Sequence, residues 1–195
     1  EIKKSERDFL NNSHIIIWTT TPWTIPVNRA LAYSEKIKYS VINIGKDNEY
    51  FQNKNIVIAS ELIKKVAEEC NFKKYKILKE FNGADLKNTV CTHPLKNMGY
   101  EYDVPMLEGS FVTLEQGTGI VHAAPSHGPD DFNLCLKHGI KASNTINDGG
   151  LYSDEVPFFS GIHIFKADNQ VIEKLAEHKS LLGSSKLTHS FPHSW

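Results

Sequence analysis

Three consecutive threonines, Thr19, Thr20 and Thr21, stand between an apolar run and two prolines. Alternate side chains of a strand face opposite ways, so we expect Thr19 and Thr21 to share one face and Thr20 to take the other. Pro22 then forces a bend, where hydroxyl and amide groups can hold a polar ligand or stabilise a developing oxyanion. Segment 19–28 is therefore a candidate binding or hydrolytic site. A plain threonine-rich strand end with a proline turn is the alternative.

A second candidate segment covers residues 117–132, where the pattern predicts a glycine turn, a buried strand, a loop and a helix start. Asp130 and Asp131 would lie in the first helical turn, where the positive end of the helix dipole stabilises negative charge. An ionised Asp at this place can hold an ammonium group through a charge-assisted hydrogen bond. The alternative is that both acids only favour the helix start, and the residues alone leave both interpretations open.

His122 is predicted to end the strand of this segment beside small residues, so its ring should border a cavity. It could be a satisfied core residue, a general base, a wall of a pocket, or a metal ligand together with His127 and an Asp. The spacing of His122, His127 and Asp130 matches no standard zinc pattern. The glycine turn at 117–119 lacks the following Gly and Lys of a phosphate-binding loop, which argues against a nucleotide site there.

The hydrophobic pattern predicts the elements that must position these side chains. Strands are expected at residues 14–20, 39–44, 55–58, 110–114, 119–123 and 162–165. Helices are expected at 61–70 with Ser60 as N-cap, at 129–139, and at about 168–182 with Gly183 as the stop. Between Phe81 and Pro105 the chain is expected to run irregularly over the surface. These elements predict one compact domain of mixed sheet with peripheral helices.

The chain has 195 residues, 40% of them hydrophobic and 23% charged, which is typical of a globular domain and excludes disorder, collagen and coiled coil. Its longest clean apolar run, residues 15–18, is far shorter than the roughly 18 residues that span a bilayer. The chain begins at Glu1 without Met and without a signal-peptide pattern. We therefore expect residues 1–195 to be a single domain cut from a longer chain.

The balance of 22 Lys and Arg against 23 Asp and Glu gives a net charge of -1, so no global field draws the chain to nucleic acid. Six lysines lie close together in the sequence: Lys64, Lys65, Lys73, Lys74, Lys76 and Lys79. We interpret them as a solvated helix face and the loop that follows it in preference to an RNA contact. The three cysteines are Cys70, Cys91 and Cys135. Their number is odd and none has C-x-x-C spacing, which argues against a disulfide framework and a zinc knuckle. Buried free thiols in a reducing cytoplasm are expected.

Together, the two segments resemble the editing domain, or connective polypeptide 1, of isoleucyl-tRNA synthetases, which are class I aminoacyl-tRNA synthetases. The resemblance is carried by residues 19–30 and 117–132 and extends to 189–195, which is similar to the return into the synthetase body. Valyl and leucyl relatives are less similar, because they usually carry an Arg before the proline and an acid after it. Thr21-Pro22-Trp23 and Val121-His122 favour the isoleucyl branch. The resemblance implies an α+β fold with a β-barrel-like core of mixed sheet and peripheral helices.

The resemblance implies post-transfer editing, the hydrolysis of valine wrongly esterified to isoleucine tRNA. By matching positions, Asp131 would hold the α-ammonium group, and His122 would line the side-chain pocket and limit its size. The residues assigned to the terminal adenosine, the ester and a positioned water are Thr19, Thr20, Thr21, Thr24 and Asn28, with Trp23, Gly119 and Val121 bordering the substrate. Hydrolysis would use neither a metal nor a covalent intermediate.

The resemblance also implies that editing needs no cofactor, since ATP and any zinc would serve other parts of the enzyme. The implied partners are the 3′ end of isoleucine tRNA carrying valine and the remainder of the synthetase chain. We expect a monomeric, cytoplasmic fragment without membrane contact. It lacks the His-Ile-Gly-His and Lys-Met-Ser-Lys-Ser signatures of amino-acid activation, so it should not aminoacylate. Two alternatives stay open: a tRNA 3′-end-binding module without catalysis, and a metal-dependent hydrolase using His122 and His127.

Overall fold

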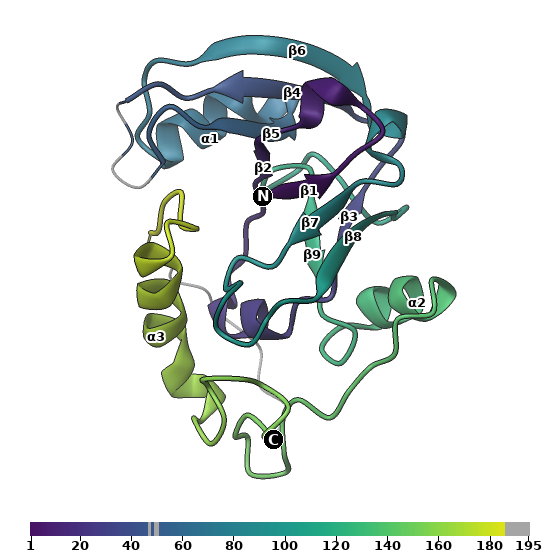
Figure 1. Ribbon diagram of the computed structural model, residues 1–195, viewed down its shortest axis with the longest axis vertical. Helices are drawn as coiled ribbons and strands as arrows, with labels where there is room; N and C mark the ends of the chain where they lie inside the picture. Colours follow the sequence, from purple (N-terminus) through teal and green to yellow (C-terminus); the bar gives the residue numbers. More distant parts are fainter. Residues whose placement is uncertain (47, 49–50, 186–195) are drawn as a thin grey trace.

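The computed structural model describes residues 1–46, 48 and 51–185, and the stretch 189–195 that entered the resemblance lies outside them. Its strands form two mixed sheets (Figure 1). In the four-stranded sheet one strand pair is parallel and the other pairs are antiparallel. Its strand order is β2 (Ser13–Ile15), β5 (Asn55–Ala59), β4 (Lys38–Asn43) and β6 (Lys76–Asn82), with β2 parallel to β5.

The second sheet has five strands and carries one of the two candidate segments. Its order is β1 (Ile2–Lys4), β7 (Val90–Thr92), β8 (Asp103–Glu108), β3 (Ala30–Tyr33) and β9 (Val121–Ala123). Strand β3 is buried along its length and pairs parallel with β8 and antiparallel with β9. The described strands thus form two open mixed sheets, which confirms the α+β class, and the barrel-like core is not a closed barrel.

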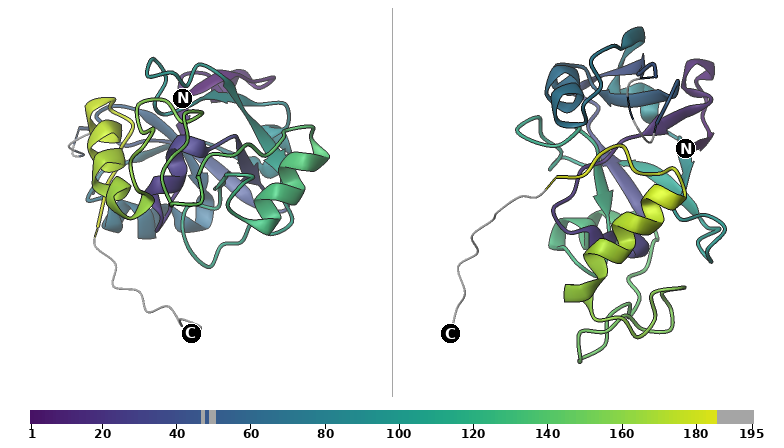
Figure 2. Two further views of the ribbon diagram at one scale, coloured as in Figure 1. Left: turned by 90° about the horizontal axis from the view of Figure 1, so that it is seen from below. Right: turned by 90° about the vertical axis from the view of Figure 1, so that its left-hand side faces the viewer.

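The helices lie around these sheets. Helix α1 (Ile63–Glu69) accompanies the four-stranded sheet, while α2 (Pro129–Lys137) and α3 (Ile164–Glu177) lie on opposite sides of the five-stranded sheet (Figures 1 and 2). Short 3-10 helices connect the strands, and the longest of them, η2 (Pro22–Val27), packs against α3. The others are η1 (Asp8–Leu10), η3 (Ser60–Leu62) and η4 (Gly83–Leu86).

Buried apolar side chains form two clusters. The larger joins the two sheets and includes Leu31 from β3 and Ile56 from β5. The smaller lies between η2 and α3, with Ile25 and Val27 on one side and Val171 on the other. Because burial of apolar area is the main favourable term in folding, the smaller cluster anchors the threonine segment to the C-terminal helix.

Several expected elements are confirmed with small changes of their ends. The strands expected at 39–44 and 55–58 are β4 and β5, the strand expected at 119–123 is β9, and the helix expected at 129–139 is α2. The helix expected at 61–70 forms as η3 followed by α1. Ser60 is not its N-cap, because the Ser60 hydroxyl hydrogen-bonds with Ser40 Oγ at 2.8 Å instead.

Three strand predictions were wrong. The strand expected at 14–20 ends at Ile15, and the chain then leaves the sheet before the threonines. Residues 110–114 form no strand, because the chain turns after Gly109 and Val112 N–H donates to Gly109 O at 3.2 Å. At 162–165, the only pairing is an isolated bridge at His163, and a helix begins at the next residue.

Two further predictions about the chain between the strands were also wrong. The segment 81–105 is not irregular throughout, since it contains β7 and the start of β8. The helix expected at 168–182 begins earlier, at Ile164, because His163 Nδ1 caps it by accepting from Phe165 N–H at 3.2 Å. It ends at Glu177, well before Gly183, and Lys179 then takes a left-handed φ of +53°.

The remaining surface features agree in part with the sequence predictions. Lys64 and Lys65 are exposed on α1, but Lys76 and Lys79 lie on strand β6 and not on a helix exit loop. The cysteines are unpaired, and burial raises the pKa of the Cys91 thiol to about 12. Among the residues placed by the structure, no helix has the length and apolar character needed to cross a membrane.

Candidate active site

The two candidate segments meet in the structure. The threonine segment enters η2 at Pro22, whose missing N–H costs nothing at a helix start, and Thr24 N–H closes the turn on Thr21 O at 3.0 Å. After η2 the chain forms β3, which pairs with β9, the strand that carries His122. This pairing brings η2 beside β9, and Thr24 Oγ1 lies 3.2 Å from His122 Nε2.

The threonine hydroxyls form a chain that leads to His122. Thr24 Oγ1 donates its single proton to Thr21 O at 2.8 Å, so it must accept from His122 Nε2–H. Thr19 Oγ1 accepts from Thr21 N–H at 3.0 Å and lies 3.2 Å from Thr21 Oγ1, which makes a long contact of 3.4 Å with Thr24 Oγ1. Thr19 and Thr21 thus lie together although no strand is present, and Thr20 is exposed.

His122 is a buried, neutral side chain at physiological pH. Burial, with a smaller effect from His127, lowers the pKa of His122 to about 4. Since Nε2 carries the proton, Nδ1 is a bare acceptor, and it has no hydrogen-bond partner among the described residues. A ring with this pKa is a poor general base at pH 7 but can form a pocket wall and accept one hydrogen bond.

Asp131 turns inward from the first turn of α2, whereas Asp130 is exposed. Asp131 Oδ2 accepts from Ala124 N–H at 2.9 Å, and Ala124 is only two positions after His122. Burial raises the pKa of Asp131, and the hydrogen bond from Ala124 opposes this shift. The other carboxylate oxygen takes part in none of the hydrogen bonds found among the described residues, which makes it a candidate acceptor for an ammonium group.

The remaining predicted site residues do not share the hydrogen bonds of the Thr24–His122 pair. Asn28 is buried at the end of η2, with its Oδ1 unpaired within the described chain. Val121 precedes His122 on β9 and therefore faces the opposite side of the strand. Gly119 has a φ of +74°, and a Cβ there would lie 2.5 Å from the Ala59 Cβ, so glycine permits the close approach to β5. Thr20 is exposed, and Thr20, Gly119 and Val121 take no part in the hydrogen bonds that join Thr24 and His122.

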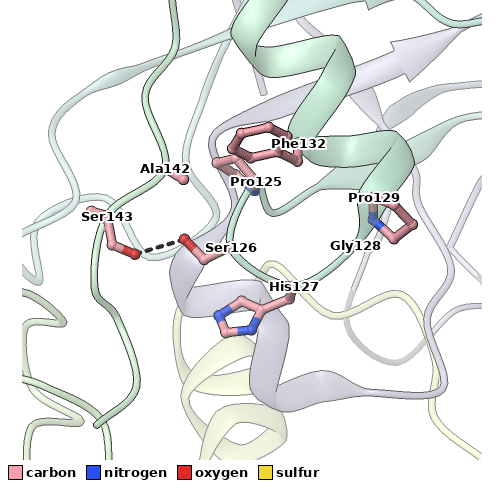
Figure 3. A pocket seen from close by; sticks show the side chains of 8 residues that line it. All are labelled: Pro125, Ser126, His127, Gly128, Pro129, Phe132, Ala142 and Ser143. Carbon is pink, nitrogen blue, oxygen red and sulfur yellow. Dashed lines mark hydrogen bonds between the residues drawn. The ribbon is translucent and has the colours of Figure 1, made fainter.

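A cavity of about 630 Å³ opens on the loop between β9 and α2 (Figure 3). Ser126 Oγ donates to Ser143 O at 2.6 Å across it, and His127 Nε2 hydrogen-bonds with Thr145 Oγ1 at 2.9 Å. Neither His122 nor the threonines line this cavity, which shares with their site only the loop that leads to Asp131. Its lining residues are Pro125, Ser126, His127, Gly128, Pro129, Phe132, Ala142 and Ser143.

The arrangement of the histidines does not favour a metal site. His122 Nε2 is hydrogen-bonded to Thr24 and His127 Nε2 to Thr145, so the two rings face different partners. Within residues 1–46, 48 and 51–185, no group of three or more His, Cys, Asp or Glu side chains could hold a metal ion. The histidine pair therefore lacks the ligand set of a metal-dependent hydrolase.

A family model described as leucyl-tRNA synthetase, editing domain, matches residues 30–161. The chain belongs to this editing-domain family. The isoleucine–tRNA ligase of Pelagibacter ubique (strain HTCC1062) is 56% identical over 194 residues, which cover 100% of this chain and 21% of the ligase. The isoleucine–tRNA ligase of Gluconobacter oxydans (strain 621H) is 44% identical over 95% of this chain and 21% of the ligase. The editing-domain chain thus spans about a fifth of the length of these relatives.

Solved structures of editing domains have the same fold. GlLeuRS-CP1 matches with a TM-score of 0.67 and 15% sequence identity, covering 94% of this chain and 87% of that one. The editing domain of the P. knowlesi cytosolic leucyl-tRNA synthetase matches with a TM-score of 0.60 and 10% identity, covering 90% and 87%. These matches confirm the expected fold, and the similarity to isoleucine–tRNA ligases confirms the expected isoleucyl branch.

Two residues outside both predicted segments contact the editing-domain site through Trp23. Asp168 Oδ1 accepts from Trp23 N–H at 3.0 Å, and the Tyr152 hydroxyl donates to Trp23 O. The sequence pattern predicts Asp168 only as the start of a helix and predicts no role for Tyr152. The sequence contains no signal for these contacts, because they join residues 145 and 129 positions apart.

Proposed function

We propose that this editing domain hydrolyses the ester bond between valine and isoleucine tRNA. The observation that carries the proposal is the 56% identity to an isoleucine–tRNA ligase over the whole of an editing-domain chain. The geometry supports it in two ways. The half-buried carboxylate of Asp131 is hydrogen-bonded to Ala124, which lies two positions after the neutral His122. A row of threonine hydroxyls leads to the same histidine.

The physical need for such a domain follows from the substrate pair. A pocket that fits isoleucine loses only about 1–3 kcal/mol when valine binds with one methylene fewer, a range for which isoleucyl-tRNA synthetases are themselves the standard example. A second pocket too small for isoleucine separates the two by steric overlap, which costs more than a missing contact. In this proposal the rigid, neutral ring of His122 sets that size limit.

Each side chain at the site then has a definite task. Asp131 accepts a hydrogen bond from the α-ammonium group with its free oxygen, while Ala124 N–H fixes the other oxygen. The hydroxyls of Thr19, Thr21 and Thr24 orient the ester and a water, and donors among them stabilise the tetrahedral oxyanion. The neighbouring ribose hydroxyl assists the attack from a fixed position. No step requires His122 to gain a proton, in keeping with its lowered pKa.

The partner in this proposal is the terminal end of isoleucine tRNA, presented by the remainder of a cytoplasmic synthetase. A net charge of -1 provides no general attraction for a polyanion, so contact is concentrated at the terminal nucleotides. Binding of whole tRNA to residues 1–195 alone should therefore be weak. A tight, strongly salt-dependent complex would contradict this part of the proposal.

The test is deacylation of preformed valyl-tRNA by the full-length synthetase. Asp131→Ala should lower the rate by roughly 100-fold, the effect of losing a hydrogen bond between charged groups. Asp130→Ala is the matched control, since Asp130 occupies the same helical turn but is exposed, and its rate should stay within about two-fold. Equal rates for Asp131→Ala and wild type would contradict the role of Asp131.

The same assay separates the alternative functions. A binding module without catalysis would bind the aminoacylated end and leave the ester intact even in the wild-type enzyme. A metal-dependent hydrolase would lose its activity after exhaustive chelation. The proposal predicts rapid hydrolysis that chelation leaves unchanged.

A further inference from the structure

The peptide groups of Trp23 are held on both sides by residues from the C-terminal third of the chain. The Trp23 N–H donates to Asp168 Oδ1 at 3.0 Å, and the Trp23 carbonyl accepts from the hydroxyl of Tyr152, a residue that is 1% exposed. Asp168 belongs to the second turn of α3, and α3 packs directly on η2. Trp23 is therefore fixed to a separate element of the fold and not only to its own helix.

Asp168 satisfies a need that η2 cannot meet by itself. The first N–H groups of a helix have no acceptor inside the helix. In η2, Pro22 has no N–H, Thr21 makes no side-chain cap, and the first turn contains no acid. A carboxylate at this position forms a charge-assisted hydrogen bond and interacts favourably with the positive helix end. Asp168 supplies that carboxylate from α3.

The position of Trp23 determines what this contact controls. Trp23 lies between Thr21 and Thr24, whose backbone closes the η2 turn and whose hydroxyls approach to 3.4 Å. Thr24 in turn accepts from His122. A rotation of the Trp23 peptide would therefore move the Thr24 hydroxyl relative to His122.

The Trp23 side chain extends the same connection to the second segment. Its ring packs edge-on against His127, with ring centroids 5.1 Å apart and an interplanar angle of 79°. His127 is itself hydrogen-bonded to Thr145, and it lies in the loop that leads to Asp131. Trp23 thus contacts α3 through its backbone and the Asp131 loop through its ring.

We propose that Asp168 is a positioning residue for the hydrolytic site, acting with Tyr152 to fix the Trp23 backbone and thereby the Thr24 hydroxyl against His122. This inference rests on the proposed function, since it concerns the same reaction. Asp168 touches Trp23 and does not touch the reacting atoms. Its loss should therefore lower kcat for deacylation and leave KM for the aminoacylated tRNA nearly unchanged, because the substrate contacts of Asp131 remain.

The test compares variants of the full-length synthetase on preformed valyl-tRNA. Asp168→Ala should lower kcat between about 10- and 100-fold with KM within about two-fold, since small misplacements of catalytic groups have effects of this size. Asp168→Asn should recover most of the rate, because its amide oxygen can still accept from Trp23 N–H. Asn169→Ala, an exposed neighbour on α3, is the matched control and should behave as wild type.

Tyr152→Phe provides a second test, at the carbonyl side of Trp23. It removes one hydroxyl and should also lower kcat without raising KM. The combined loss in the Asp168→Ala, Tyr152→Phe double variant should be smaller than the product of the single losses, because both contacts fix the backbone of the same residue, Trp23. Aminoacylation and the thermal melt of each preparation report whether the protein is folded, and if Asp168→Ala does not fold, Tyr152→Phe and Asp168→Asn decide the question.

The possible failures can be told apart. If the wild-type enzyme does not hydrolyse valyl-tRNA, the proposed function is wrong. If the wild type is active and Asp131→Ala is inactive, but Asp168→Ala and Tyr152→Phe keep the wild-type kcat, only the positioning role is overturned. An Asp168→Asn variant as slow as Asp168→Ala would also overturn it, because Asn keeps the acceptor for Trp23 N–H and loses only the charge.

Discussion

The two segments of the candidate site are held in different ways. The part of segment 117–132 that holds Asp131 is built from neighbours in sequence: Asp131 binds Ala124 N–H seven positions earlier, and His127 N–H closes a turn on Ala124 O at 2.9 Å. The threonine segment depends on Trp23 contacts with Asp168 and Tyr152, more than a hundred positions away. The loop and helix start at residues 124–131 can thus form locally, whereas the threonine segment acquires its geometry only when α3 packs on η2.

The largest expected effect concerns the glycine turn of segment 117–132, which contacts β5 and is therefore less local than the Asp131 loop. Gly119→Ala should destabilise the fold by about 3 kcal/mol, because it combines a left-handed backbone with a Cβ at 2.5 Å from Ala59. Gly139→Ala is the matched control, with the same φ of +74° and no atom within 4 Å of the added Cβ, and should cost only about 1 kcal/mol. Urea unfolding measures both. Equal losses would show that the approach to β5 is unimportant.

A pH series tests the burial of His122. Its pKa is lowered from 6.5 to about 4, so the native state stays neutral while the unfolded chain takes up a proton below pH 6.5. Stability is therefore complete above pH 6.5 and is lost as the pH falls toward 4. Between pH 7 and pH 5, protonation of this residue in the unfolded chain should lower the free energy of unfolding by about 2 kcal/mol.

The His122→Gln variant isolates that contribution from other buried histidines such as His93, whose pKa burial lowers to about 3. Its free energy of unfolding should fall less steeply between pH 7 and pH 5 than that of the wild type. Chemical denaturation at each pH gives the comparison. Parallel curves for variant and wild type would mean that His122 is accessible to protons in the native state.

The smallest expected effect concerns the contact that joins the two segments. Thr24→Val keeps the shape of the side chain but leaves the buried His122 Nε2–H without an acceptor, which should cost about 1–2 kcal/mol of stability. Thr20→Val, at an exposed threonine of the same segment, should change stability by less than about 0.5 kcal/mol. Thermal unfolding of the two variants provides the test, and similar shifts for both would argue that the Thr24–His122 contact is not formed.

The contrast between the segments also explains what the sequence could predict. Gly128, Pro129 and the two acids mark the start of α2 by local capping and dipole effects, and the structure has that helix start. The β-branched runs of β4 and β5 predict strands equally well, and the structure has both strands. Where the geometry depends on neighbours in sequence, the pattern is sufficient.

The errors have physical causes of the opposite kind. The pattern predicts that the threonines end a strand, but Pro22 starts a 3-10 helix whose first N–H, that of Trp23, is satisfied by Asp168 of α3. Strand β6 is mostly exposed and rich in Lys and Glu, and β8 contains Pro105, so neither has a strong strand pattern. The positions of the threonine hydroxyls around His122 depend on these tertiary contacts. The sequence could therefore predict which residues are candidates for the site but not how they are arranged.

The most direct measurement of the central claim is a crystal structure with a nonhydrolysable valyl-adenosine analogue. We expect the α-ammonium group to lie within hydrogen-bond distance of Asp131 and the valine side chain to pack against His122, with the ester carbonyl near the threonine hydroxyls. An analogue bound instead in the cavity beside Phe132 and Ser143, out of reach of Thr24 and His122, would contradict this expectation.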